Sequence, residues 1–158
     1  PIIFVVENNL FASHMHISQR QSKSSIKRFG DANEIESFLL DGNDVIEISN
    51  VMKMALNKSR QKSQPALIEA VTYRWLGHVD WREDLDVGVS RSIEDLNHWK
   101  QRDPIKRLII SMENAKVVSE NFFEELEFNL NKDINKMWEQ ALHDPLPKTS
   151  SLLDNVYY

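Results

Sequence analysis

The sequence contains no cysteine and only four glycines among its 158 residues. Without cysteine there is no disulfide framework, no thiolate metal site and no cysteine nucleophile. The scarcity of glycine agrees with the absence of a phosphate-binding glycine loop, a Rossmann glycine fingerprint and a serine elbow. A His-Glu-x-x-His zinc motif is also missing. Several of the commonest enzyme signatures are therefore excluded.

Long apolar runs and an excess of basic charge are absent as well. No run approaches the roughly 18 apolar residues of a membrane helix, and no signal peptide precedes the first apolar segment. The net charge is -5, and the densest basic segment, residues 53–62, has no aromatic side chain on which bases could stack. We therefore expect a cytoplasmic protein that binds neither nucleic acid nor membrane.

Apolar runs and turn residues predict a parallel α/β sheet. Residues 1–7 form a buried-strand run, residues 37–40 a second one, and residues 66–73 a third. Between the last two, Asp44 can cap a helix that should end near Gln64, because the residue before Pro65 avoids the α region. A strand, a long helix and a strand in this order indicate a right-handed parallel crossover, with helices on both faces of the sheet. The polar residues 12–36 are expected to form an irregular surface excursion.

The remainder of the chain reads as helical. Ser92 is a candidate N-cap, Asp103-Pro104 is typical of a helix start, and an apolar stripe follows from Ser119 to Asp144. A long connection rich in charged residues, histidine and tryptophan, residues 74–89, precedes these helices. We predict two regions: residues 1–90, the C-terminal half of an α/β domain, and residues 91–158, a helical extension. A chain that opens with Pro1 in an apolar strand is expected to begin inside a domain.

Two adjacent asparagines, Asn8 and Asn9, follow the first strand directly. The carboxyl end of a parallel strand is where open α/β sheets bind ligands, and an amide oxygen suits a hard cation such as Mg²⁺. The alternative is an ordinary turn, which asparagine also favours. Spacing alone favours the turn.

Three histidines are candidate site residues. His14 and His16 alternate and could share a face, but no third metal ligand accompanies them. His78 follows Gly77 just beyond the third strand, and its imidazole could donate to a diphosphate oxygen while Arg74 anchors the loop. The alternative is a histidine that only holds the loop by hydrogen bonds.

Together these segments resemble the alpha subunit of the thiamine-diphosphate-dependent, decarboxylating component of 2-oxo acid dehydrogenase complexes, specifically its C-terminal half. The resemblance rests on the order of PIIFVVENN, LLDGNDV, PALIEAVTYRWLGH, the segments around residues 91–96 and 102–108, and the closing LLDNVYY. That family includes the pyruvate, branched-chain and acetoin enzymes. Its thiamine motif opens with Gly-Asp-Gly and closes with Asn-Asn, and only the closing half is present here.

The resemblance implies a fold, cofactors and site residues. It implies a thiamine-diphosphate-binding fold with Mg²⁺ ligated by the side chain of Asn9 and the backbone carbonyl of Phe11. It implies that His78 is the catalytic residue and contacts the diphosphate, and that Arg74 and Arg91 anchor the loop. Glu7 could orient the asparagines. The implied cofactor-binding set is Asn8, Asn9, Phe11, Ser13, Arg74 and His78.

The implied activity is decarboxylation of a 2-oxo acid and acyl transfer to a lipoyl group. The implied partners are a beta subunit, in a heterotetramer of two alpha and two beta subunits, and a lipoyl-domain acyltransferase. Val79 replaces the serine that a regulatory kinase phosphorylates in the family, and the loop after it departs from the family pattern. Two alternatives remain open: a thiamine enzyme acting on a sugar-derived or other ketone, and a non-catalytic interaction module.

Overall fold

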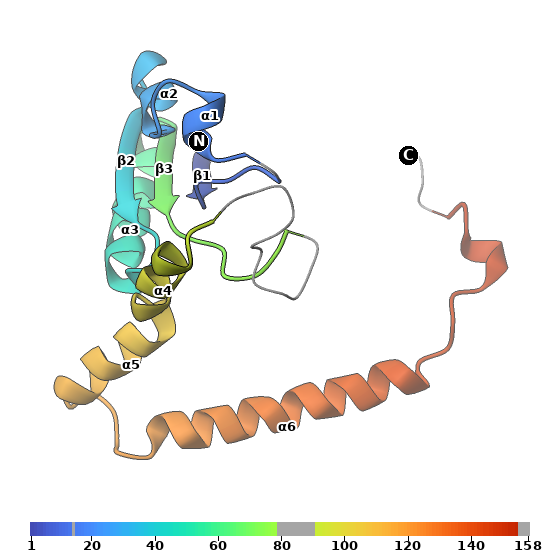
Figure 1. Ribbon diagram of the computed structural model, residues 1–158. Coiled ribbons are helices and arrows are strands. Elements are labelled where there is room, and N and C mark those ends of the chain that lie inside the picture. Colours follow the sequence, from blue (N-terminus) through green and yellow to red (C-terminus); the bar gives the residue numbers. More distant parts are fainter. Residues whose placement is uncertain (14, 79–90, 155–158) are drawn as a thin grey trace. The chain divides into compact units, whose positions relative to one another are not determined.

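Among the residues that the structure describes, three parallel strands form a sheet: β1 (Ile3–Asn8), β2 (Glu36–Asp41) and β3 (Ala66–Val71), in the order β1-β3-β2. The computed structural model describes residues 1–13, 15–78 and 91–154. It divides into two compact units, residues 1–111 and 112–158. The sheet belongs to the first unit, and Figure 1 shows β3 lying between β2 and β1. The predicted α/β fold with a parallel sheet is confirmed.

The central strand β3 carries the most deeply buried part of the sheet. Its residue Ala66 pairs with Ile3 on one side and with Glu36 on the other. All residues of β3 except Val71 are buried, as expected for an apolar strand with a neighbour on each edge. The strand ends at Val71, slightly before the predicted limit.

Helix α3 (Val45–Lys62) covers one face of the sheet. The side chain of Asp44 accepts a hydrogen bond from the backbone N–H of Glu47 at 2.9 Å, which confirms the predicted cap. The helix ends at Lys62, and the residue that caps it, Ser63, has a left-handed φ of 54°. Side chains of α3 and of the strands share one core cluster, made of Leu40, Ala55, Ala66 and Ile68.

Two short helices, α1 (Ile17–Arg20) and α2 (Lys27–Ala32), lie within the segment predicted to be irregular, so that prediction is wrong. Gly30 of α2 packs on the face of the sheet opposite α3: a Cβ there would lie 2.0 Å from the hydroxyl oxygen of Ser37 and 3.3 Å from the Cβ of Leu67. Those two residues alternate with Phe38 and Ile68, which face α3. Helices therefore cover both faces.

Helices α4 (Ile93–Gln101) and α5 (Pro104–Asn114) follow, and α5 runs across the boundary between the two units. Both begin as predicted. The hydroxyl of Ser92 accepts from the N–H of Asp95 at 3.2 Å, and the carboxylate of Asp103 accepts from the N–H of Ile105 at 2.9 Å.

The second unit contains α6 (Phe122–His143) and the 3₁₀ helix η1 (Thr149–Ser151). The predicted apolar stripe lies on α6, where it is solvent-accessible, with Leu130 52% and Ile134 59% exposed. Among the described residues, no helix is both long enough and apolar enough to cross a membrane. The predicted division at residues 90 and 91 stays a prediction.

Candidate functional site

The segments that follow β1 and β3 leave the sheet at the same edge. The two strands are neighbours, and their pairing continues past the end of β3, where the N–H of Thr72 donates to the carbonyl of Asn8 at 3.0 Å. Asn9 and the residues leading to His78 therefore emerge side by side at the carboxyl edge, the part of a parallel sheet that commonly binds ligands.

Two consecutive side-chain turns shape the loop after β1. The side-chain oxygen of Asn8 accepts from the N–H of Leu10, and that of Asn9 accepts from the N–H of Phe11, both at 3.0 Å. Leu10 has a left-handed φ of 69°, which is uncommon for a residue other than glycine. Further bonds close the loop, among them one from the N–H of Ile17 to the carbonyl of Leu10 at 2.7 Å. Both asparagines therefore form turns, and the turn at Asn9 leaves one lone pair of its side-chain oxygen available. The ligand role of Asn9 stays a prediction.

The two asparagines differ in their surroundings. Asn8 is 7% exposed, and its amide nitrogen donates to the carboxylate of Glu69 at 2.6 Å. Asn9 is half-buried, and its side-chain oxygen accepts from the N–H of Phe11 in the adjoining turn. Glu7 is exposed, so the expectation that it orients the asparagines is wrong; Glu69 holds Asn8 instead. One indication in the sequence points to a special role for Glu69: it is the single carboxylate in an otherwise apolar strand.

The residues after β3 form a second group. The guanidinium of Arg74 donates from Nε to the carbonyl of Leu76 at 2.8 Å, and its Nη1 lies 3.1 Å from Nδ1 of His78. Because a guanidinium can only donate, Nδ1 of His78 must accept in this contact, which places the imidazole proton on Nε2. His78 is exposed. Its Nε2–H is therefore the group that can donate to a ligand.

Arg91 connects the two groups. Its side chain is buried and donates to the carbonyls of Arg74 and Leu76. Its guanidinium carbon lies 5.9 Å from the ring centre of Phe11 and 5.3 Å from that of Tyr73. Burial raises the pKa of the Tyr73 hydroxyl, which stays neutral. These residues border a cavity of about 340 Å³, lined by Leu10, Phe11, His16, Tyr73, Arg91, Ser92, Asp95 and Trp99.

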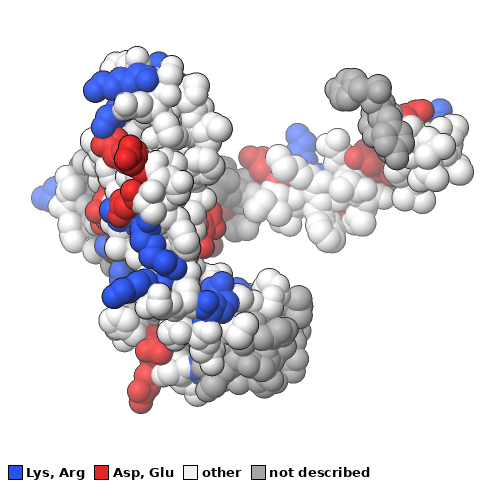
Figure 2. All heavy atoms as spheres, turned by 90° about the horizontal axis from the view of Figure 1, so that it is seen from above, with Lys and Arg blue, Asp and Glu red and all other residues white. Residues whose placement is uncertain are grey.

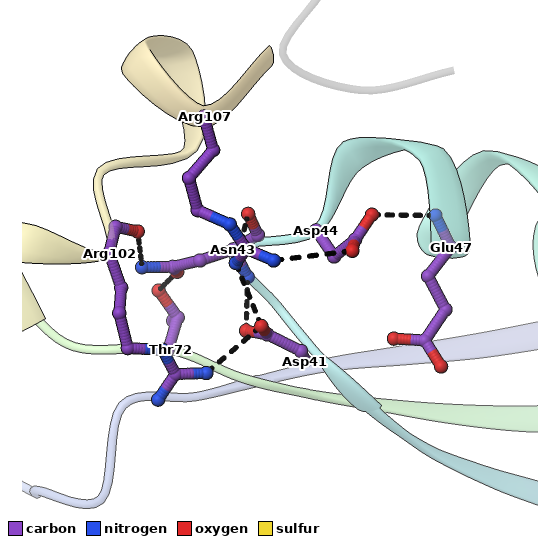
Figure 3. A network of polar contacts seen from close by, with 7 residues as sticks. All are labelled: Asp41, Asn43, Asp44, Glu47, Thr72, Arg102 and Arg107. Atoms are coloured by element: carbon purple, nitrogen blue, oxygen red, sulfur yellow. Dashed lines mark hydrogen bonds and ion pairs between the residues drawn. The ribbon is translucent and has the colours of Figure 1, made fainter. Parts of the chain in front are cut away.

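A polar network fixes the carboxyl edge further along the sheet, at the end of β2 (Figure 3). One carboxylate oxygen of Asp41 lies 2.8 Å from the guanidinium of Arg107 and 2.9 Å from that of Arg102. Asn43 joins this network to β3 and α4: its side-chain oxygen accepts from the hydroxyl of Thr72, and its nitrogen donates to the carbonyl of Arg102, both at 2.8 Å. The network ties the ends of two strands to the start of α5.

Charged side chains are interspersed elsewhere. On the face shown in Figure 2, basic and acidic groups lie among one another without forming a stripe of one sign. Among residues 1–13, 15–78 and 91–154, no group of three or more His, Asp or Glu side chains could hold a metal ion. Amide and backbone oxygens, which also bind hard cations, are a separate class of ligand.

Asn9 and Phe11 offer such oxygens. The side-chain amide oxygen of Asn9 and the backbone carbonyl of Phe11 are neutral, hard donors of the kind that Mg²⁺ accepts. Within the described part of the chain, no hydrogen-bond donor contacts the carbonyl of Phe11. The donor set fits Mg²⁺ in kind, and two oxygens leave an octahedral site to be completed by other groups.

The remaining predicted residues are placed as follows. Ser13 is half-buried in the loop after Phe11. His16 caps α1, with its Nδ1 2.7 Å from the hydroxyl of Ser18, and so it has a structural role in this loop. His14 and Val79 lie outside the described residues, as does most of the divergent loop.

The profile of the dehydrogenase E1 component family matches residues 1–150. This chain belongs to that family. Its rice relative, the chloroplastic pyruvate dehydrogenase E1 component subunit alpha-3 of Oryza sativa subsp. japonica, is 32% identical over 99% of this chain and 36% of the rice protein. The pyruvate dehydrogenase E1 component subunit alpha of Porphyra purpurea is 33% identical over 96% of this chain and 43% of its own length.

A relative named for a different substrate is as similar to this E1 family chain. The mitochondrial 2-oxoisovalerate dehydrogenase subunit alpha of Macaca fascicularis is 32% identical over 99% of this chain and 35% of the macaque protein. The chain thus spans less than half the length of each of these three relatives. The resemblance to the alpha subunits of 2-oxo acid dehydrogenases is confirmed.

Proposed function

We propose that this chain supplies the closing half of a Mg²⁺ and thiamine diphosphate site in the alpha subunit of a 2-oxo acid dehydrogenase. The whole enzyme would decarboxylate a 2-oxo acid and pass the acyl group to a lipoyl acceptor. Membership of the E1 family and the names of the relatives support this class of reaction. Pyruvate and a branched-chain oxo acid are equally compatible with those names.

The observation that carries the proposal is that the segment with Asn9 and Phe11 and the segment with His78 follow two neighbouring parallel strands at the same end of the sheet. Asn9 would ligate Mg²⁺ through its side-chain oxygen, and Phe11 would do so through its backbone carbonyl. Asn8 lies behind them and holds the turn by its bond to Leu10. The remaining ligands of an octahedral Mg²⁺ would come from the diphosphate, from water and from a group outside this chain.

His78 would bind the diphosphate through Nε2–H. Its contact with Arg74 supports this role, because a donating guanidinium at Nδ1 favours the tautomer that carries its proton on Nε2. Arg74 and Arg91 would hold the loop by their bonds to its carbonyls. Ser13 would contribute a hydroxyl to the same loop. Each of these residues binds or orients, and none has to move a proton during turnover.

Thiamine diphosphate, when bound, supplies the electron sink that a 2-oxo acid needs for loss of carbon dioxide. The carboxylate that contacts the loop after β1, that of Glu69, is fully buried and bonded on both oxygens, so it is not placed to act as a general base. We infer that such a base comes from a beta subunit, in an assembly of two alpha and two beta subunits. A lipoyl-domain acyltransferase would be the acceptor. The cytoplasmic location stays a prediction from sequence.

The proposal is tested by replacing Asn9 in the intact protein assembled with its beta subunit. Asn9→Ala should abolish Mg²⁺-dependent binding of thiamine diphosphate in titration calorimetry, because a metal ligand is lost. Asn9→Asp should retain binding, since aspartate keeps both an oxygen for the metal and an acceptor for the N–H of Phe11.

Asn33→Ala is the matched control. Its side chain is exposed and donates to the carbonyl of Phe29 in α2, at 2.7 Å. This variant should bind the cofactor as the wild type does. Undiminished binding by Asn9→Ala would refute the assignment of the site. Cofactor binding without turnover of any 2-oxo acid would favour the non-catalytic module instead.

A further inference from the structure

Glu69 is a buried carboxylate that the proposed chemistry does not use. It lies in the middle of β3 and has no exposed surface. A buried charge is costly unless it is hydrogen-bonded, and here four donors surround it. One carboxylate oxygen accepts from the hydroxyl of Ser25 at 2.8 Å and from the N–H groups of Ile26 and Lys27 at 2.8 and 2.6 Å.

The other carboxylate oxygen of Glu69 accepts from the side-chain nitrogen of Asn8 at 2.6 Å. Burial raises the pKa of the Glu69 carboxyl, but the four donors outweigh this effect and lower the pKa overall. The group therefore stays ionised. An ionised carboxylate can only accept hydrogen bonds, so the side chain of Asn8 must donate to it.

That condition fixes the orientation of the Asn8 amide. Its nitrogen faces two groups that can only accept, the Glu69 carboxylate and the carbonyl of Ser24 at 3.3 Å. Its oxygen faces a group that can only donate, the N–H of Leu10 at 3.0 Å. In the reversed orientation, the amide oxygen would face the two acceptors and the NH₂ group would face the N–H of Leu10, so all three hydrogen bonds would be lost.

The first of the two turns after β1 is thereby anchored in the protein interior. The bond from Leu10 to Asn8 closes that turn, within which Leu10 adopts its left-handed conformation. The second turn begins one residue later, at Asn9, and its side-chain bond stays within the loop. The position of Asn9 and Phe11 therefore depends on Asn8.

We propose that Glu69 is a positioning residue for the cofactor loop: its carboxylate fixes the Asn8 amide, and through it the turn that presents Asn9 and Phe11. The inference rests on the proposed function for the identity of the ligand. Glu69 itself touches neither metal nor cofactor in this arrangement. It acts by requiring the Asn8 amide to donate, and not accept, in the hydrogen bond between them.

The direction of that bond can be tested by exchanging donor and acceptor. In Glu69→Gln, the single amide oxygen is needed by Ser25, Ile26 and Lys27, so the new NH₂ group meets the NH₂ group of Asn8. In Asn8→Asp, two carboxylates meet across the same 2.6 Å contact. In the double variant, the amide introduced at position 69 donates to the carboxylate introduced at position 8, whose other oxygen still accepts from the N–H of Leu10.

The four proteins are compared as the intact protein assembled with its beta subunit. Each single variant should weaken Mg²⁺-dependent binding of thiamine diphosphate by roughly 10- to 100-fold, as loss of a residue that orients a metal ligand typically does. The double variant should recover most of that loss. Glu36→Gln is the control: Glu36 pairs with Lys58 at the surface, and the affinity of this variant should stay within about twofold of the wild type, since exposed pairs contribute little.

A second measurement needs no cofactor. Hydrogen–deuterium exchange of the peptide spanning residues 8–13, measured without ligand, should accelerate in both single variants and return towards the wild-type rate in the double variant. If the double variant exchanges as fast as the single variants, the direction of the bond does not hold the turn, and the proposal is overturned.

The two proposals fail in different ways. Normal cofactor affinity in Glu69→Gln, together with reduced affinity in Asn9→Ala, would overturn the positioning role and leave the proposed function intact. Normal affinity in Asn9→Ala would overturn the proposed function itself. Should Glu69→Gln fail to assemble, Asn8→Ser removes the amide while leaving Glu69 bonded to α2, and normal affinity in that variant would equally overturn the positioning role.

Discussion

Replacing Asp41 by asparagine is expected to lower the free energy of unfolding by about 2 kcal/mol at neutral pH. The substitution preserves the shape of the side chain. It also preserves the hydrogen bond from the N–H of Asn43, 2.9 Å long in the native protein, because the amide oxygen of asparagine can still accept it. The other oxygen becomes an NH₂ group. It then faces the guanidinium groups of Arg102 and Arg107 in place of a carboxylate.

The expected loss of about 2 kcal/mol follows from how far the charged side chains are exposed to solvent. Asp41 is 24% exposed, and Arg102 and Arg107 are 35% and 38% exposed, so solvent screens both pairs. Exposed ion pairs contribute about 0.2–1 kcal/mol each, and the partial burial of the carboxylate places these two near the upper limit. A double-mutant cycle with Arg107→Gln should therefore give a coupling free energy of about 1 kcal/mol.

Urea unfolding of the intact protein is the assay, repeated from pH 7 to pH 3. Burial raises the pKa of Asp41, but its bonds to Arg107, Asn43 and Arg102 lower the pKa overall. A carboxyl whose folded pKa is lowered stabilises the protein above its unfolded pKa of about 4, and this contribution is lost as pH falls through the folded pKa. The difference between wild type and Asp41→Asn should therefore be constant above about pH 5 and should narrow below about pH 4.

Asp31→Asn serves as the control because Asp31 pairs with Lys27 one helical turn away, at the surface of α2. Asp31→Asn should lower the free energy of unfolding by only about 0.3–0.5 kcal/mol. The reasoning is refuted if Asp41→Asn is no more harmful than this control. A difference from wild type that does not narrow at acid pH would also refute it, because the contribution of Asp41 would then not depend on its charge.

Two further substitutions test the backbone. Gly42→Ala should destabilise the protein by about 1–3 kcal/mol in urea unfolding, because the new methyl group would lie 2.7 Å from the backbone carbonyl oxygen of Val71 and would force the backbone to shift. A stabilised variant would show that the turn has room for this methyl group. Ser63→Gly should raise the free energy of unfolding by about 0.5 kcal/mol in the same assay, because glycine adopts the left-handed conformation of this helix end without steric cost. A lower midpoint for Ser63→Gly would contradict this account.

The sheet and the long helices were predictable because their signals are local. The apolar runs of β1 and β3 and the turn at Asp41 stand out within short segments of the chain, and Asp44 marks the start of α3 by its own chemistry. The caps of α4 and α5, at Ser92 and Asp103, are local in the same sense. Tertiary contacts were needed only to give the order of the strands.

The helix α2 could not be predicted, because the group that caps it lies elsewhere in the sequence. The short helix α1, in contrast, is capped locally by His16 and Gln19. The first N–H groups of α2 bond to Glu69, more than 40 positions along the chain. The same residue contacts Asn8, and no short segment of the sequence indicates that contact. The ligand roles of Asn9 and Phe11 stay predictions. Glu7 was the nearest carboxylate in sequence, but it lies exposed on the neighbouring strand. Distance along the chain is a poor guide to contact when strands are parallel.

The strand order carries a consequence for how the chain folds. β1 and β2 do not pair with each other; both pair with β3, which is the last of the three to be synthesised. Until residues 66–71 have been synthesised, neither β1 nor β2 can form its pairing with β3. Pairings between such distant segments also close slowly. Synthesis of β3 is thus the step that allows these three strands to join in one sheet.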